Sequence, residues 1–257
     1  MVRQRHDFLR TYYFGYPDGG RGKAAFPQMR MAALSEIGTS VLFAVKYGKY
    51  TTSEHALFKE LIPQLEKGML LIADRLFYCY ESWKSASDTG ADLLWRVKKN
   101  AKLDVIETLN DGSYLAKIYP SWSDRRRDQN GIIVRVVDYN IEGIEDGEDI
   151  YRLITTILDP NEAPAEELAK LYHQRWSIEG IFDEFKNHLR EEKLILKSLK
   201  PELVIQEFYG LLLAHYSIRG IMYEAAKKAS IEPAELSFTH AIRVIRRRMK
   251  ALSVFSP

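Results

Sequence analysis

Four polar side chains in the stretch 171–190 are spaced so that one face of a helix would carry them all. They are Tyr172, Arg175, Glu179 and Lys186. At about 100° per residue on an α-helix, these side chains fall within roughly 60° of each other. A carboxylate between two cations suits a metal-binding acid beside a phosphate backbone. Spacing alone favours a plainer interpretation, a solvated helix flank with ordinary ion pairs, because such flanks are common.

A helix must hold this polar line in place, and the sequence predicts how it is anchored. An apolar stripe runs beside the line and is available for burial; it consists of Leu171, Ile178, Phe182, Phe185 and Leu189. Pro164 is placed to open the helix near its first turn, where a missing N–H costs nothing. Burial of the stripe would direct the polar line into a groove.

A further acid, Asp74, follows a short apolar run. Residues 69–73 read Met-Leu-Leu-Ile-Ala, a pattern typical of a strand covered on both faces. Polar function gathers at the carboxyl ends of strands in open α/β sheets. The alternative for Asp74 is a helix cap or a surface ion pair, which accounts for such a residue about as often.

Alternating strand-like runs and amphipathic helical runs predict an α/β fold. Residues 28–47 indicate a hairpin that turns at Gly38, and residues 93–98 a strand. Helices are expected over 54–66, 78–87, 202–229 and 239–249. Four more strand-like runs cover 102–109, 114–119, 131–139 and 151–158, with a turn at residues 110–112.

Bulk properties restrict the partners. A net charge of +2 over 257 residues is too small for a general polycation, so nucleic-acid contact must use local basic patches. The candidate patches are Lys98, Lys99 and Lys102; Arg125, Arg126 and Arg127; and Arg243, Arg246, Arg247, Arg248 and Lys250. Each is more often a solvated surface. The single Cys79 excludes an internal disulfide and fits the cytoplasm, where we expect packing as its role. No membrane partner is expected, because no apolar run is long enough to span a bilayer.

The spacing Tyr-x2-Arg-x3-Glu-x6-Lys resembles the signature of bacterial insertion-sequence transposases of the DDE type, in the insertion sequence 4-like subgroup. The match is complete at Tyr172, Arg175, Glu179 and Lys186. Further blocks look like the family in the same order: 25–28, 31–34, 70–77, 96–100, 109–114, 196–198, 201–202 and 206–207. The resemblance therefore covers nearly the whole chain.

The resemblance implies a ribonuclease H-like core with a metal site. By it, Asp74 becomes the second carboxylate of the site and Glu179 the third. The intact family site holds two Mg²⁺ ions, which suit the hard oxygen ligands of Asp and Glu. Tyr172, Arg175 and Lys186 would grip DNA phosphates, and Arg75 is a further candidate.

The resemblance also divides the chain into three parts. Residues 1–99 are expected to form the first part of the core, 100–158 a β-rich insertion, and 159–257 the signature helix with the C-terminal helical part. The family's first aspartate has no match after an apolar strand, since Asp7 and Asp18 lack such a strand before them. We therefore expect an N-terminally truncated chain without the first core strand, whose neighbouring strands show unpaired edges.

Three functions remain in view. The first is a DNA transposase that cleaves and transfers strands at insertion-sequence ends, in an inactive truncated form. The second is a non-catalytic DNA-binding module, or a remnant that inhibits assembly of full-length subunits. The third is a metal-dependent nuclease without strand transfer. Double-stranded DNA is the expected partner, as transposon ends and as target, and a homodimer is left open.

Overall fold

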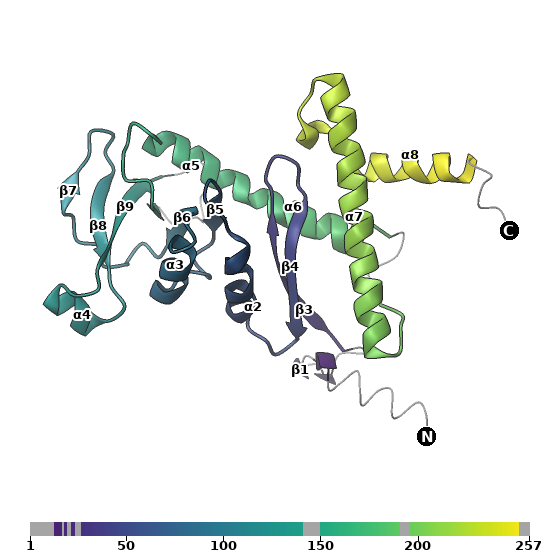
Figure 1. Cartoon of the computed structure of the whole chain (residues 1–257), viewed down its shortest axis with the longest axis horizontal. Helices are drawn as coiled ribbons and strands as arrows, with labels where there is room; N and C mark the ends of the chain where they lie inside the picture. The colour runs from purple at the N-terminus through teal and green to yellow at the C-terminus, as the bar shows by residue number, and fades with distance from the viewer. Residues whose placement is uncertain are drawn as a thin grey trace. The chain divides into compact units, whose positions relative to one another are not determined.

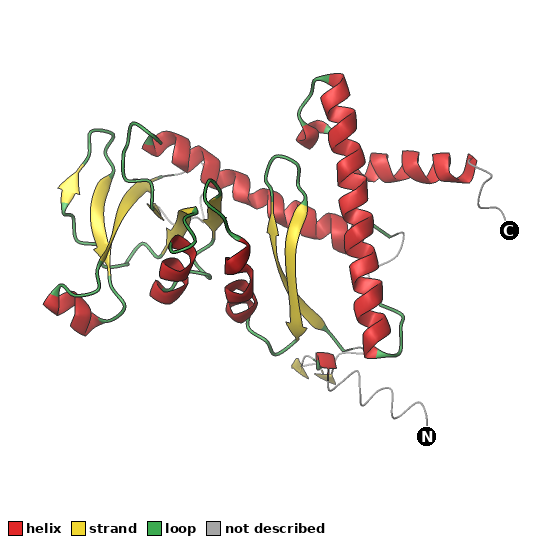
Figure 2. Cartoon of the chain, viewed as in Figure 1, coloured by secondary structure: helices red, strands yellow, loops and turns green. Residues whose placement is uncertain are grey.

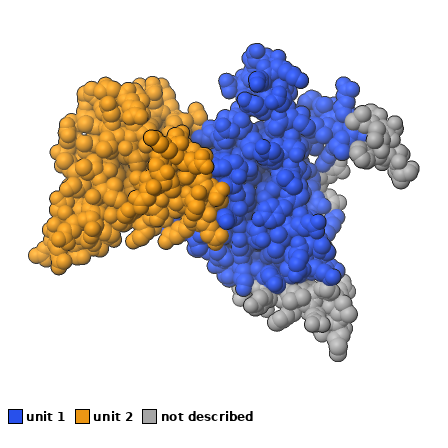
Figure 3. Space-filling model, viewed as in Figure 1, with its two compact units in different colours: residues 1–57, 176–257 blue, residues 58–175 orange. Residues whose placement is uncertain are grey.

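The computed structural model describes residues 13–16, 18–19, 22–23, 27–140, 150–190 and 196–251, with backbone alone at 18–19, 22–23 and 250–251. The chain divides into two compact units (Figure 3). Unit 1 comprises residues 1–57 and 176–257, and unit 2 comprises residues 58–175. Each unit has its own core. Among the described helices, none combines the length and apolar character that crossing a bilayer requires.

Unit 1 contains a long hairpin and the C-terminal helices (Figure 1). Its strands are β1 (Asp18–Gly19), β2 (Gly22–Lys23), β3 (Met29–Ser35) and β4 (Leu42–Lys49). Its helices are α6 (Ser177–Asp183), the π-helix η3 (Glu184–His188), α7 (Pro201–Ala229), the 3₁₀-helix η4 (Pro233–Glu235) and α8 (Phe238–Ala251). Helix α2 (Glu54–Leu61) begins in this unit and ends in unit 2.

Unit 2 is built around a sheet (Figure 2). Its strands are β5 (Leu70–Ala73), β6 (Asp92–Val97), β7 (Glu107–Thr108), β8 (Tyr114–Ile118), β9 (Ile132–Tyr139) and β10 (Tyr151–Thr155). Its helices are η1 (Ile62–Gln64), α3 (Tyr80–Ser87), α4 (Trp122–Arg127) and α5 (Ala165–His173). The 3₁₀-helix η2 (Gln174–Trp176) follows α5 and crosses into unit 1.

The six strands form one mixed sheet in the order β5-β6-β10-β9-β8-β7, which confirms the α/β class. β5 and β6 are parallel, whereas the other neighbours are antiparallel. The predicted division of the chain into three parts stays a prediction; in this sheet, β5 and β6 come before residue 100 and the other four strands come after it. Residues 100–158 are β-rich as expected, but β10 pairs directly with β6 and brings the other three strands with it. The run 102–109 forms a strand only at Glu107–Thr108.

The absence of the first core strand stays a prediction, and the outer strands of the sheets are known only for the described residues. β5 is the outer strand of the six-stranded sheet, and β3 and β4 pair only with each other among the described residues. Asp7 lies outside the described residues, and only the backbone of Asp18 lies within them, in β1.

Helix α5 covers one face of the sheet, and strand alternation determines what it covers. Tyr139 pairs with Tyr151, and Val137 pairs with Leu153, so both pairs project to this face. The apolar middle of the face packs against Leu168 of α5 in a buried cluster. This packing explains the near-continuous apolar character of the central strands.

Aromatic side chains fill the core of unit 2 beneath α3. The rings of Trp83 and Trp95 lie 5.3 Å apart at 83°, and Phe58 lies 5.6 Å from Trp95. Cys79 has a different role from the packing that we expected. It is the N-cap of α3, where its Sγ accepts a hydrogen bond from the backbone N–H of Ser82 at 3.4 Å.

The core of unit 1 joins the hairpin to the helices. Its buried residues are Phe185, Leu189, Phe208, Met222, Phe238 and Ile242. Tyr47 of β4 meets Phe208 of α7 at 5.7 Å between ring centroids. Met29, Met31 and Val45 pack against the same cluster from the hairpin. The predicted hairpin and both C-terminal helices are confirmed.

The signature helix is helical at every residue from Ala165 to His188, but it is not regular. Residues 174–176 form a 3₁₀ turn and residues 184–188 a π turn. The uniform 100° per residue that places four polar residues on one line therefore does not apply. Of the expected apolar stripe, Phe185 and Leu189 are buried, whereas Leu171, Ile178 and Phe182 are only partly buried.

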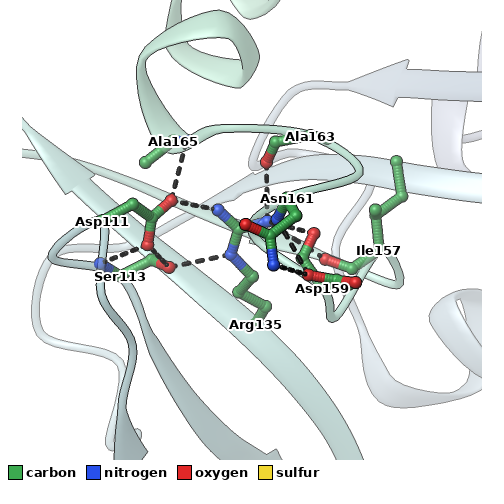
Figure 4. A network of polar contacts seen from close by, with 8 residues as sticks. All are labelled: Asp111, Ser113, Arg135, Ile157, Asp159, Asn161, Ala163 and Ala165. Carbon is green, nitrogen blue, oxygen red and sulfur yellow. Dashed lines mark hydrogen bonds and ion pairs between the residues drawn. The ribbon is translucent and has the colours of Figure 1, made fainter.

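A buried arginine fixes the start of α5 (Figure 4). Arg135 is 0% exposed and pairs with Asp111, while its Nε donates to Ser113 Oγ at 2.8 Å. Its Nη1 donates to three carbonyl oxygens of the loop before α5: those of Ile157, Asp159 and Ala163, at 3.5, 3.3 and 2.7 Å. Asp111 Oδ2 also accepts the N–H of Ala165, the first residue of α5, at 2.9 Å.

Replacement of this arginine is expected to be strongly destabilising. Arg135→Met leaves the partly buried Asp111 without its cation and three carbonyls without a donor, so the free energy of unfolding should fall by about 3–5 kcal/mol. Chemical denaturation measures the change. Arg125→Met is the matched control, since Arg125 pairs with the 85% exposed Asp104 and should cost about 1 kcal/mol or less. Equal losses in the two variants would show that Arg135 is not structurally central.

Candidate active site

Asp74 stands at the carboxyl end of β5, directly after Ala73. The parallel register pairs Ala73 with Trp95, so Asp74 and Arg96 are the next residues along two neighbouring strands. The Asp74 side chain is 25% exposed, and its Oδ1 accepts the backbone N–H of Arg75. Arg75 itself is exposed. The predicted acid at a strand end is therefore in place and reachable from solvent.

The signature helix reaches Asp74 through Arg175. Arg175 Nη2 lies 3.4 Å from Asp74 Oδ2, and its side chain is 14% exposed. The Arg175 guanidinium also lies 5.6 Å from the ring centroid of Tyr172. Two of the four motif residues thus gather around the predicted catalytic acid within unit 2.

Tyr172 is buried, and its predicted contact with DNA phosphates stays a prediction. It is 2% exposed and belongs to the core beneath α5. Burial, and then the nearby charge of Asp74, raise the pKa of Tyr172 to about 12. The phenol is therefore neutral at physiological pH. The ring lies in the core beside the Arg175 guanidinium and not on the exposed surface.

Three further side chains complete this end of the sheet, and the sequence reasoning missed them. The guanidinium carbon of Arg96 lies 4.1 Å from the ring centroid of Tyr151. The ring centroids of Tyr139 and Tyr151 lie 5.6 Å apart. Burial, followed by the neighbouring Tyr172 and Tyr151, raises the pKa of Tyr139. Strand alternation could have revealed the group, since Tyr139, Tyr151 and Arg96 share the face covered by α5.

Glu179 and Lys186 belong to unit 1. Glu179 is exposed in the first turn of α6, and Lys186 is exposed in the π turn with its Nζ 5.3 Å from the ring centroid of Phe182. Both side chains are therefore available for a ligand. The meeting of Glu179 with Asp74 stays a prediction.

The two predicted metal ligands are both carboxylates. Asp74 and Glu179 present carboxylate oxygens, the ligand type that Mg²⁺ prefers. Among the described residues, no group of three or more His, Cys, Asp or Glu side chains is arranged to hold an ion. The Arg175 guanidinium lies beside the Asp74 carboxylate and compensates its negative charge.

The basic runs differ in what their side chains do. Arg125 is engaged by Asp104, and Arg126 lies 5.7 Å from the ring centroid of Trp122. Arg246 donates to the carbonyl of Leu189 at 3.3 Å. Among the described side chains, the exposed cations of the three runs are Lys98, Lys99, Lys102, Arg126, Arg127, Arg243, Arg247 and Arg248, and the side chain of Lys250 lies outside the described part.

The burial of Tyr172 leads to a testable dependence of stability on pH. A pKa raised to about 12 means that the unfolded chain ionises this phenol first, so its contribution is intact below pH ~10 and is lost between about 10 and 12. In alkaline denaturation, Tyr172→Phe should lose stability less steeply over this window than the unsubstituted chain. Tyr216→Phe, an exposed position on α7, is the control. A slope unchanged by Tyr172→Phe would contradict the burial of the phenol.

Comparisons with known proteins show the family to which the chain belongs. Residues 4–216 match the transposase DDE domain family. The chain is 29% identical over 256 residues to transposase InsG for insertion sequence element IS4 of Escherichia coli strain K12, covering 97% of this chain and 55% of that protein. It is 26% identical over 107 residues to putative transposase InsZ of the same strain, covering 41% of this chain and 36% of that protein. The chain thus spans about half or less of these relatives' lengths.

A likeness among solved structures concerns the fold alone. The structure of a piggyBac transposase synaptic complex with hairpin DNA matches 93% of this chain and 51% of that chain, with a TM-score of 0.50 and 12% identity. The family match is the stronger finding, since it extends over most of the sequence and includes Asp74, Arg175 and Glu179. The chain belongs to the transposase DDE domain family.

Proposed function

We propose that this chain is a DNA transposase of the DDE type in an inactive form, which corresponds to the part that cleaves and transfers strands at insertion-sequence ends in the intact family. The observation that carries the proposal is the contact between Asp74, at the end of β5, and Arg175 of the signature motif. A strand-end acid and a helix motif predicted separately from sequence meet at 3.4 Å. The likeness to a solved transposase supports a ribonuclease H-like core as the scaffold.

Each residue of the motif has a proposed role. Asp74 and Glu179 supply oxygen ligands for Mg²⁺, which when bound activates an attacking oxygen and stabilises the leaving oxygen. Arg175 holds the Asp74 carboxylate in orientation and, with Arg75 and Lys186, offers positive charge to the phosphates around the cleaved strand. Tyr172 acts from the core by fixing Arg175.

A second function deserves a direct comparison, namely DNA binding without chemistry. Asp74 and Glu179 are the two carboxylates that match the family's site in this chain. Two carboxylates do not give both magnesium ions the charge and geometry that in-line displacement needs. The cationic residues that would meet DNA do not depend on those ions. Binding and cleavage are therefore separable in this chain.

We expect the 257-residue chain to bind duplex DNA in a salt-dependent way and not to cleave it. Binding to an insertion-sequence end should weaken linearly on a plot of log affinity against log salt, since each neutralised phosphate releases counterions. Cleavage would be followed with Mg²⁺ or Mn²⁺, with Glu179→Ala as the control. Robust cleavage that Glu179→Ala abolishes would show that Asp7, Asp18 or another acid completes the site. Binding that does not depend on salt would contradict the proposal.

Shared metal ligation by the two acids can be tested without DNA. Asp74→Asn and Glu179→Gln should each weaken Mn²⁺ binding by about tenfold or more, measured by electron paramagnetic resonance of the free ion. The double variant should be little worse than either single variant, because one lost ligand already opens the shared site. Glu166→Gln is the control, since Glu166 pairs with Lys170 on the exposed side of α5. Fully additive losses would show two independent ions.

A further inference from the structure

A buried charge cluster in unit 1 has no part in the site described above. Glu184 accepts hydrogen bonds from two side chains of α7: His215 Nε2 lies 3.2 Å from its Oε2, and Arg219 Nε lies 3.1 Å from the same oxygen. Arg219 also reaches Oε1, so both carboxylate oxygens are engaged. The side chains of His215, Arg219 and Glu184 are 1%, 7% and 15% exposed.

The same glutamate begins an unusual turn. Residues 184–188 form the π-helix η3, and the N–H of Leu189 donates to the carbonyl of Glu184 at 2.8 Å. A π turn takes one more residue than an α turn, so it changes the direction in which later side chains project. Lys186, the last residue of the signature motif, lies inside this turn.

Contacts from two helices hold both ends of the turn. Glu184, at its start, is fixed by His215 and Arg219 of α7, and Arg246 of α8 donates to the Leu189 carbonyl just past its end, at 3.3 Å. Lys186 itself is exposed between these anchors. The polar cluster therefore constrains the backbone that carries an exposed cation.

We propose that Glu184, held by His215 and Arg219, is a positioning residue that fixes the π turn and thereby directs Lys186 at DNA phosphate. This assignment rests on the proposed function, since Lys186 must meet DNA. A purely structural account explains the arrangement less well. The apolar cluster of unit 1 already joins η3, α7 and α8, and a buried ion pair adds little stability over apolar packing. An ion pair does specify one geometry, because its partners must align.

The test is a double-mutant cycle read out by DNA binding, with a short duplex as the probe. Lys186→Ala should reduce the slope of log affinity against log salt by about one, as expected for one lost phosphate contact. Glu184→Gln keeps the size of the side chain and removes its charge, and it should reduce the slope by the same amount. The double variant should bind no more weakly than Lys186→Ala alone.

Controls separate positioning from loss of folding. Glu207→Gln is the matched variant: Glu207 lies on α7, accepts the N–H of Ser198 at 3.1 Å and pairs with Arg190 rather than with a residue of the π turn, so its slope should equal that of the unsubstituted chain. Amide hydrogen exchange at Leu189 reports the π turn directly and should accelerate in Glu184→Gln but not in Glu207→Gln. Where Glu184→Gln does not fold, His215→Gln provides the same cycle, since it perturbs one partner of Glu184.

The outcomes distinguish this inference from the proposed function. A normal slope in Glu184→Gln, or losses that add in the double variant, would overturn the positioning role while leaving DNA binding intact. A slope that Lys186→Ala does not change would remove the phosphate contact and the inference with it. Binding without salt dependence in the unsubstituted chain would overturn the proposed function itself. The inference is supported if Lys186→Ala, Glu184→Gln and the double variant share one reduced slope of log affinity against log salt. Glu207→Gln should then keep the slope of the unsubstituted chain.

Discussion

The buried guanidinium of Arg135 is the constraint on which the geometry of unit 2 depends. It is fully enclosed, and it gathers Asp111, Ser113 and the carbonyls before α5 around one charge. Burial alone would raise the pKa of Asp111, but hydrogen bonds from Ser113 and Ala165, together with Arg135, hold it below its ordinary value. The ionised pair thus sets where α5 starts. Arg175 comes ten residues after Ala165, so the same anchor determines where its guanidinium meets Asp74.

The sheet face beneath α5 is polar at both ends and apolar in the middle. Arg135 and Thr155 occupy one end, and Tyr139 and Tyr151 occupy the other, beside Arg96. The apolar middle excludes water and keeps the two ends apart, because it packs against Leu168 and Tyr172. One end fixes the helix mechanically and the other carries the candidate chemistry. A low-dielectric interior strengthens the electrostatic contact between Arg175 and Asp74 at the second end.

The sequence predicted the elements well and their partners less well. Periodicity and turn residues identified the hairpin, the Asp74 strand and the C-terminal helices, because these depend on local chemistry. The alternation of apolar and polar residues predicts which face of a sheet a side chain lies on, but not which strand pairs with which. The pairing of β6 with β10 was therefore not predicted. Hydrogen-bond register in a helix leaves no mark on apolar spacing, which hid the π turn at Glu184. Arg135 and Arg219 were missed because charged residue types are usually exposed.

The ion pair between Arg135 and Asp111 closes the hairpin of β8 and β9. This closure has a consequence for where the fold can accept added residues. Asp111 and Ser113 precede β8, and Arg135 lies in β9, so the two ends of the segment between them are joined by one charge pair. Residues inserted at the tip of this segment, near the exposed helix α4, lie beyond the ion pair and do not displace α5. Each doubling of a flexible loop costs only about 0.6 kcal/mol in closure entropy. The tip is therefore a tolerant insertion point, where a tag or a small domain can be grafted without moving the signature helix.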